Sequence, residues 1–173
     1  QNELYKITTD SASNEVKDIE TISNETLDYI KRMKEMGNKH LIGETTGFFN
    51  LDKQTTGFNS GDLIIIGARP AMGKTALVLN MALKNIELGK GVIVFSLEMP
   101  AEQLLLRMLS AKTSIPLQNL RKGDMDDQQW SNLSKSFEDL QNKKLFVDDG
   151  GSLNINQLRA RVRKLAQNQD NNI

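Results

Sequence analysis

The chain has 173 residues, in which 22 Lys and Arg balance 22 Asp and Glu, with one His and no Cys. This length predicts one domain with a sizeable core, and an apolar fraction of 38% plus 12 Gly is ordinary for a soluble protein. The absence of Cys excludes a disulfide framework, a Cys-ligated zinc site and a thiol nucleophile within this chain. The single His40 excludes a site that needs two histidines, and it is given no role.

No apolar run exceeds four residues, so the sequence predicts no membrane span, no membrane partner and no secretion signal. We therefore expect a cytoplasmic protein. The balanced total charge divides unevenly, because residues 1–45 carry six basic and nine acidic groups while residues 46–173 carry sixteen and thirteen. Such segregation is typical of an acidic interaction segment beside a domain with a basic face, although three charges are a modest excess.

The first part of the chain predicts a linker and an isolated helix. Residues 1–15 are polar and are expected to form a flexible linker. Apolar side chains then recur at steps of three and four residues, which predicts a helix over 16–37 that ends at Gly37-Asn38. The members of this apolar stripe are Ile19, Ile22, Thr26, Tyr29, Ile30 and Met33. One amphipathic helix is marginal in water, so the stripe must be buried on this chain or on another molecule.

The remaining chain alternates between expected strands and helices. Turns and one helical turn near Leu51 are expected over 43–62. Buried strands are expected at 63–66, 92–97 and 145–147, and helices at 74–88, 101–111, around Trp130 to Leu140, and at 154–167. Trp130 and Phe137 share the spacing of Leu133, and we expect all three in the core. This alternation predicts an α/β fold with right-handed crossovers.

The most informative segment lies between the first strand and its helix. Residues 68–75 resemble the phosphate-loop pattern G-x-x-x-x-G-K-[ST], with Ala68 in place of the first glycine. Backbone N–H groups and the helix N-terminus would receive phosphates, Lys74 would reach the β- and γ-phosphates, and Thr75 would hold Mg²⁺. The candidate phosphate-binding residues are Ala68, Arg69, Pro70, Ala71, Met72, Gly73, Lys74 and Thr75. The alternative is a glycine-rich turn with an exposed lysine.

Carboxylates follow the two later strands. Glu98 comes just after the second strand, and the carboxyl ends of parallel strands meet at one edge of a sheet, so Glu98 should face Lys74. There it would polarise the water that attacks the γ-phosphate, or it would merely cap the helix after Pro100. Asp148 follows residues 145–147 and is a candidate for the Walker B carboxylate that organises Mg²⁺, although three apolar residues make a short run. The basic helix at 154–167, with Arg159, Arg161, Arg163 and Lys164, is either a solvated face or a nucleic-acid contact.

Longer stretches resemble one family. The run TTGFFNLDKQTTGFNSGDLIIIGARPAMGKTALVLNMAL, followed by VIVFSLEMP, resembles the ATPase domain of DnaB-type replicative helicases. The resemblance extends through LRKGDMDDQQW and KLFVDDG and covers about residues 43–165. The form ARPAMGKT, with Ala at the first glycine position, is itself typical of this family.

The resemblance implies a RecA-like P-loop NTPase core, an α/β fold with a mostly parallel sheet flanked by helices, preceded by a linker helix at 16–37. It implies that this helix docks on the neighbouring subunit of a homo-hexameric ring, and that residues 43–173 are the N-terminal portion of the ATPase domain. Lys74 and Glu98 would be catalytic, Thr75 would bind Mg²⁺, and ATP would be the nucleotide. Single-stranded DNA, primase and a helicase loader would be partners.

The resemblance also implies that Asp148 and Asp149 are not the Walker B carboxylate. That residue, the DNA-binding loops and the arginine finger would lie beyond residue 173, and the primase-binding domain would lie before residue 1. The missing strand should lie next to the 63–66 strand. Two alternatives remain: another RecA-like ATPase, such as a recombinase or a clock-type hexamer, or a nucleotide-binding assembly module without catalysis.

Overall fold

The computed structural model describes residues 17–35 and 41–168, which belong to two compact units divided between residues 39 and 40. The expected linker at 1–15, the helix end at Gly37-Asn38 and the single histidine lie outside the described residues. Within the described ranges, no helix is long and apolar enough to cross a bilayer.

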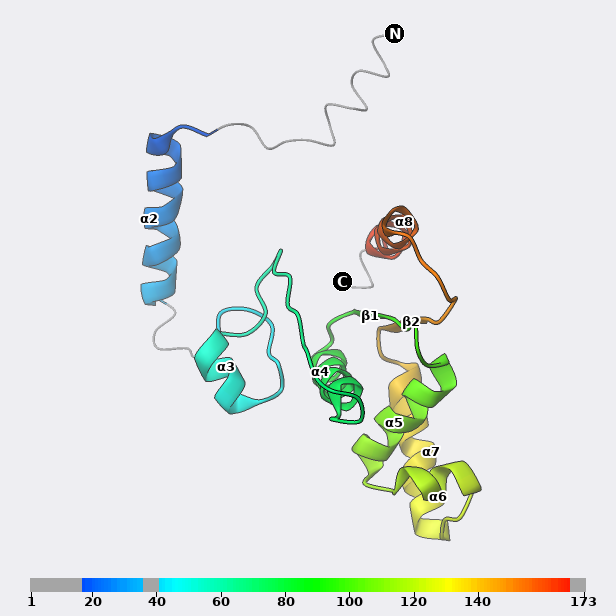
Figure 1. Ribbon diagram of the computed structural model, residues 1–173. Helices are drawn as coiled ribbons and strands as arrows, with labels where there is room; N and C mark the ends of the chain where they lie inside the picture. Colours follow the sequence, from blue (N-terminus) through cyan, green and yellow to red (C-terminus); the bar gives the residue numbers. More distant parts are fainter. Residues whose placement is uncertain (1–16, 36–40, 169–173) are drawn as a thin grey trace. The chain divides into compact units, whose positions relative to one another are not determined.

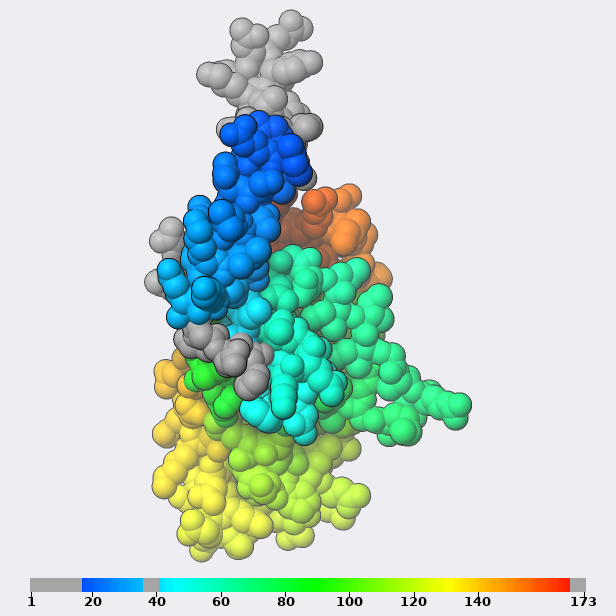
Figure 2. Space-filling view, turned by 90° about the vertical axis from the view of Figure 1, so that its left-hand side faces the viewer, coloured from blue at the N-terminus to red at the C-terminus, as the bar shows by residue number. Residues whose placement is uncertain are grey.

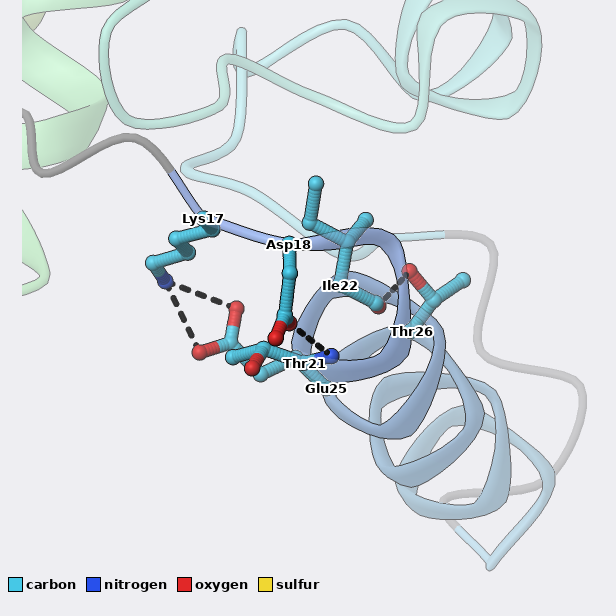
Figure 3. A network of polar contacts seen from close by, with 6 residues as sticks. All are labelled: Lys17, Asp18, Thr21, Ile22, Glu25 and Thr26. Carbon is cyan, nitrogen blue, oxygen red and sulfur yellow. Dashed lines mark hydrogen bonds and ion pairs between the residues drawn. The ribbon is translucent and has the colours of Figure 1, made fainter.

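The first unit contains the predicted isolated helix, α2 (Ile19–Glu35). The Asp18 carboxylate accepts a hydrogen bond of 2.8 Å from the Thr21 N–H and so caps its first turn, as Figure 3 shows. Lys17 forms an ion pair with Glu25 at 2.8 Å in the same view. No residue of α2 is buried, and its apolar stripe is exposed.

The second unit combines six helices and two strands among its described residues (Figure 1). In chain order they are α3 (Phe49–Thr55), α4 (Lys74–Glu87), β1 (Val92–Phe95), α5 (Ala101–Thr113), α6 (Leu117–Lys122), α7 (Asp127–Gln141), β2 (Leu145–Asp148) and α8 (Ile155–Ala166). The two strands are parallel, with Val92 opposite Leu145 and Phe95 opposite Asp148. Three helices lie between them in sequence, so the α/β expectation is confirmed.

The core lies where α4, α5 and α7 pack. Helix α5 contacts both α4 and α7, and α4 also contacts β1. Ile86 of α4 and Leu109 of α5 are completely buried. The other buried apolar residues of this core are Leu79, Ala82, Leu83, Leu104, Met108, Ile115, Leu133 and Leu140. Helix α4 ends as predicted, with Gly89 in the left-handed region at φ +83°.

The expected strand at 63–66 is absent. These residues have no ladder partner among the described strands, and Leu63 and Ile65 are 88% and 84% exposed. An apolar groove of about 980 Å³, lined by Ile64, Ile66 and all of β1, separates this segment from β1. A strand needs a hydrogen-bonded neighbour, and the described chain places none at that distance from 63–66.

Three smaller expectations also differ. Trp130 is 61% exposed and Phe137 is 37% exposed, whereas Leu133 of the same helix is buried, so only Leu133 belongs to the core. The short helix α6 was not expected from the sequence. Pro100 is the N-cap residue of α5 and not part of its first turn.

A buried carboxylate holds the segment that precedes the phosphate loop. Asp52 of α3 accepts hydrogen bonds from the Thr45 hydroxyl, from the Thr46 N–H at 2.7 Å and from the Thr46 hydroxyl at 2.6 Å. Asn85 of α4 donates to the Thr45 carbonyl at 2.8 Å and so ties this segment to the core helix. Burial raises the pKa of Asp52, but these hydrogen bonds together outweigh it and hold the pKa below the ordinary value.

We predict that Asp52→Asn lowers the free energy of unfolding by about 1–3 kcal/mol at pH 7, because an amide leaves one buried donor without an acceptor. Since the folded-state pKa is depressed, the carboxylate contributes its full stabilisation above about pH 4 and loses it as the pH falls through the folded pKa. Urea unfolding of both proteins from pH 7 to pH 3 should show the difference shrinking with acid.

The matched control is Asp124→Asn, because Asp124 is exposed and its carboxylate makes no hydrogen bond among the described residues. A difference between wild type and Asp52→Asn that stays constant with pH, or one equal to that of Asp124→Asn, would contradict the role given to Asp52.

Candidate functional site

The N-terminus of α4 is an open ring of backbone donors. Gly73 is its N-cap residue at φ +86°, and no side chain caps this end. The first N–H groups of a helix have no partner within the helix, so they and the positive end of the helix dipole are available to an anion. Gly73 suits the left-handed conformation because it has no Cβ, while Ala71 adopts a positive φ of 63° at a cost in strain.

One cavity brings together the three residues that the sequence singles out for chemistry. Lys74 and Thr75, the first two residues of α4, and Glu98, from the loop after β1, all line a cavity of about 400 Å³. Its apolar wall comes from Ile64, Ile66, Val78, Leu79, Val94, Phe95, Leu97, Met99 and Leu104. The two ends that the sequence placed at one sheet edge therefore border a single space.

The other predicted phosphate-loop residues do not line this cavity. Residues 68–73 are exposed, and the segment that leads into α4 projects from the surface in the space-filling view of Figure 2. Among the described residues, the Lys74 ammonium has no ion-pair partner. Its charge is therefore uncompensated beside the open helix end.

The loop that carries Glu98 is fixed at both ends. At its start, the Ser96 N–H donates to the Asp148 carbonyl at 2.9 Å. The Ser96 hydroxyl donates to the Met99 carbonyl at 2.6 Å and accepts from the Met99 N–H at 3.2 Å, which closes the turn around Glu98. At its end, the Asp149 carboxylate accepts from the Ala101 N–H at 2.8 Å.

Asp148 and Asp149 are engaged in structural contacts away from the cavity. Asp148 accepts from Arg161 of α8 and from the Gly150 N–H, and the Arg161 guanidinium holds the pKa of Asp148 below its ordinary value. Neither aspartate lines the cavity of Lys74 and Glu98. Arg161 is thus partly committed to an ion pair within the chain.

The donor set fits a nucleoside triphosphate with Mg²⁺. An open helix N-terminus, a free ammonium and a hydroxyl are groups that bind phosphate and its magnesium ion. Within the described ranges, no group of three or more acidic or histidine side chains is placed to hold a metal alone. Mg²⁺ keeps several waters and takes phosphate oxygens as ligands, so the Thr75 hydroxyl is compatible with a metal that arrives with a nucleotide.

Sequence reasoning missed Ser96 and Asp149 as parts of this site. Ser96 looked like an ordinary strand-end residue, and Asp149 lies 48 residues beyond the N–H that it binds. No local pattern in the sequence could have joined Asp149 to the start of α5, because the contact depends on how β1 pairs with β2.

A glycine turn that opens a helix, beside parallel strands with a carboxylate past the strand end, defines this unit as an α/β domain of the P-loop class. The family model for the DnaB-like helicase C terminal domain matches residues 43–173. The chain therefore belongs to the DnaB-like helicase family.

Individual relatives agree with this assignment. The chain is 45% identical to the replicative DNA helicase DnaB of Helicobacter pylori strain 26695 over 165 residues, which cover 95% of this chain and 34% of that protein. It is 40% identical to the DnaB of Geobacillus stearothermophilus over 87% of this chain and 33% of that protein. It is 38% identical to the replicative DNA helicase DnaC of Bacillus subtilis over 91% and 34%. The chain thus spans about a third of the length of these relatives.

Solved structures show the same fold. A helicase-like ATPase domain of known structure superposes with a TM-score of 0.77 at 26% identity, over 83% of this chain and 51% of that one. A DnaB-like replicative helicase, studied for its interactions with primase, superposes with a TM-score of 0.75 at 25% identity, over 96% of this chain and 39% of that one. The fold is therefore RecA-like, as the resemblance implied.

Proposed function

We propose that this chain binds and hydrolyses ATP as part of a replicative DNA helicase. The observation that carries the proposal is the single cavity lined by Lys74, Thr75 and Glu98 at the open N-terminus of α4. The similarity to proteins named replicative DNA helicases, at up to 45% identity, supports the wider activity.

Each residue has a distinct task in the proposed hydrolysis. The loop from Ala68 to Gly73 and the first N–H groups of α4 hold the phosphates, and Lys74 neutralises charge on the transferred phosphoryl group. Thr75 contributes its hydroxyl to Mg²⁺, which when bound neutralises charge on the phosphate oxygens. Glu98 orients the attacking water and accepts its proton.

Residues 43–173 are proposed as the N-terminal portion of the ATPase domain. The chain covers only 51% of the ATPase domain of known structure that it superposes on, which supports this division. A strand from the remaining portion would fit between residues 63–66 and β1, because both face the groove of about 980 Å³. In that position it would bury Ile64 and give both neighbours hydrogen-bond partners.

Helix α2 is proposed to dock on a neighbouring subunit of a hexameric ring. The helix has no buried residue, and Ile19, Leu27 and Ile30 are 77%, 51% and 55% exposed. Apolar side chains in such an arrangement favour burial against a partner. Single-stranded DNA, primase and a helicase loader are proposed partners of the whole protein, and one structural relative was studied with primase.

A noncatalytic nucleotide-binding module is the second candidate. It is favoured by the fact that, among the described residues, no carboxylate lies beside Lys74 and Thr75 in their cavity except Glu98. The same variants separate the two candidates, because a binding module loses binding with Lys74 but has no hydrolysis for Glu98 to support.

We predict that Lys74→Ala in the full-length protein abolishes ATP hydrolysis and weakens nucleotide binding, because the phosphates lose their only cationic contact from α4. Glu98→Gln should keep nucleotide binding and lower kcat by about 10²–10⁴-fold, the usual contribution of a general base. A coupled phosphate-release assay and titration with a fluorescent ATP analogue measure the two effects, with Lys84→Ala on the exposed side of α4 as the control. Hydrolysis that persists in Lys74→Ala would contradict the proposed site.

We predict that Ile30→Asp weakens assembly of the full-length protein by at least tenfold, since a charge in an apolar contact costs more than about 1.4 kcal/mol. Asn24→Asp adds the same charge to the opposite, polar face of α2 and should leave assembly unchanged. Sedimentation velocity measures both. Equal assembly of the two variants would show that the stripe is not the subunit contact.

A further inference from the structure

The Glu98 side chain is placed by its backbone. Among the described residues, no hydrogen bond or ion pair holds the Glu98 carboxylate. Its position in the cavity therefore depends on the conformation of the loop from Ser96 to Ala101, which joins β1 to α5. Whatever fixes this loop also fixes the carboxylate.

The end of this loop is capped from a distant part of the chain. The N-cap residue of α5 is Pro100, whose side chain makes no capping hydrogen bond. The Ala101 N–H, the first donor of the helix, instead donates to the Asp149 carboxylate at 2.8 Å. A carboxylate at a helix N-terminus makes a strong, charge-assisted bond and also interacts favourably with the helix dipole.

Asp149 is itself held in place by the end of β2. The Asp148 carbonyl accepts from the Ser96 N–H at 2.9 Å, so consecutive residues of β2 and its extension bind the start and the end of the same loop. The Asp148 carboxylate is tied to Arg161, which fixes the chain at that point. The Ser96 hydroxyl closes the loop internally through both polar groups of Met99.

We infer that Asp149, together with Ser96, is a positioning residue for the proposed catalytic Glu98. The inference rests on the proposed function, since it gives Asp149 a role in hydrolysis through Glu98. Asp149 touches neither Lys74 nor Thr75 and does not line their cavity, so it does not act on the nucleotide directly. It keeps the loop in the one conformation that presents Glu98 to the cavity.

The test compares Asp149→Ala with Asp149→Asn in the full-length protein. The alanine variant removes the acceptor of the Ala101 N–H, whereas the asparagine variant retains a carbonyl oxygen that can accept the same bond. We expect Asp149→Ala to lower kcat for ATP hydrolysis by about 10–100-fold, the cost of a small misplacement of a catalytic group. The Kd for a nonhydrolysable ATP analogue should change by less than about twofold, since the α4 N-terminus is untouched, and Asp149→Asn should restore most of kcat.

Asp126→Ala is the matched control. Asp126 also caps a helix with its carboxylate, by accepting from the Gln129 N–H of α7 at 2.7 Å, but α7 does not border the cavity. It should lose a similar amount of stability to urea and keep its kcat. Ser96→Ala loosens the same loop from within and should repeat the split between kcat and Kd, which decides the question if Asp149→Ala does not fold.

Three results would overturn the inference: an unchanged kcat in Asp149→Ala and Ser96→Ala, an equal loss of kcat in Asp126→Ala, or a loss of nucleotide affinity that matches the loss of kcat. Failure of the proposed function gives a different pattern, because Glu98→Gln would then leave hydrolysis intact. If Glu98→Gln abolishes hydrolysis and Asp149→Ala does not, only the positioning role is wrong.

Discussion

The packing of α4 is the constraint on which the candidate site depends. Leu79, Leu83 and Ile86 bury one side of this helix, and each fully buried side chain of this size contributes about 1.5–3 kcal/mol. That burial fixes the axis of the helix and hence the place of its first turn. Asn85, on the same helix, also holds the Thr45 carbonyl of the preceding segment. The first turn therefore meets the cavity in a conformation that the core has already determined.

Two helices begin beside the carboxyl ends of the strands, and the chain treats them differently. The first N–H of α5 is bound by the Asp149 carboxylate, whereas no side chain caps α4. Each helix N-terminus attracts negative charge for the same electrostatic reason. Since the protein supplies an anion to α5 and none to α4, and places the Lys74 ammonium beside the latter, the contrast supports an external phosphate as the partner of α4.

The sequence predicted the elements whose signals are local. Helix α4 and its end at Gly89 follow from apolar spacing and a left-handed glycine, and β1 and β2 follow from short apolar runs. The 63–66 prediction was wrong because an apolar run indicates a need for burial but does not supply a hydrogen-bonded neighbour. Trp130 was placed in the core by spacing alone, yet the packing of α7 on α5 uses Leu133 and Leu140. The partnership of Asp149 with Ala101 depends on strand pairing, which no local pattern encodes.

The central claim, that the open N-terminus of α4 binds phosphate opposite Glu98, is tested most directly by the backbone amide NMR spectrum during titration with a nonhydrolysable ATP analogue and Mg²⁺. The largest shifts should fall on the amides of Gly73, Lys74 and Thr75, because phosphate oxygens would accept hydrogen bonds from this turn. The Ala101 amide should change little, because Asp149 already occupies it. The account would be contradicted by a spectrum in which the α4 amides stay unchanged at saturating nucleotide, or in which the shifts centre on α5.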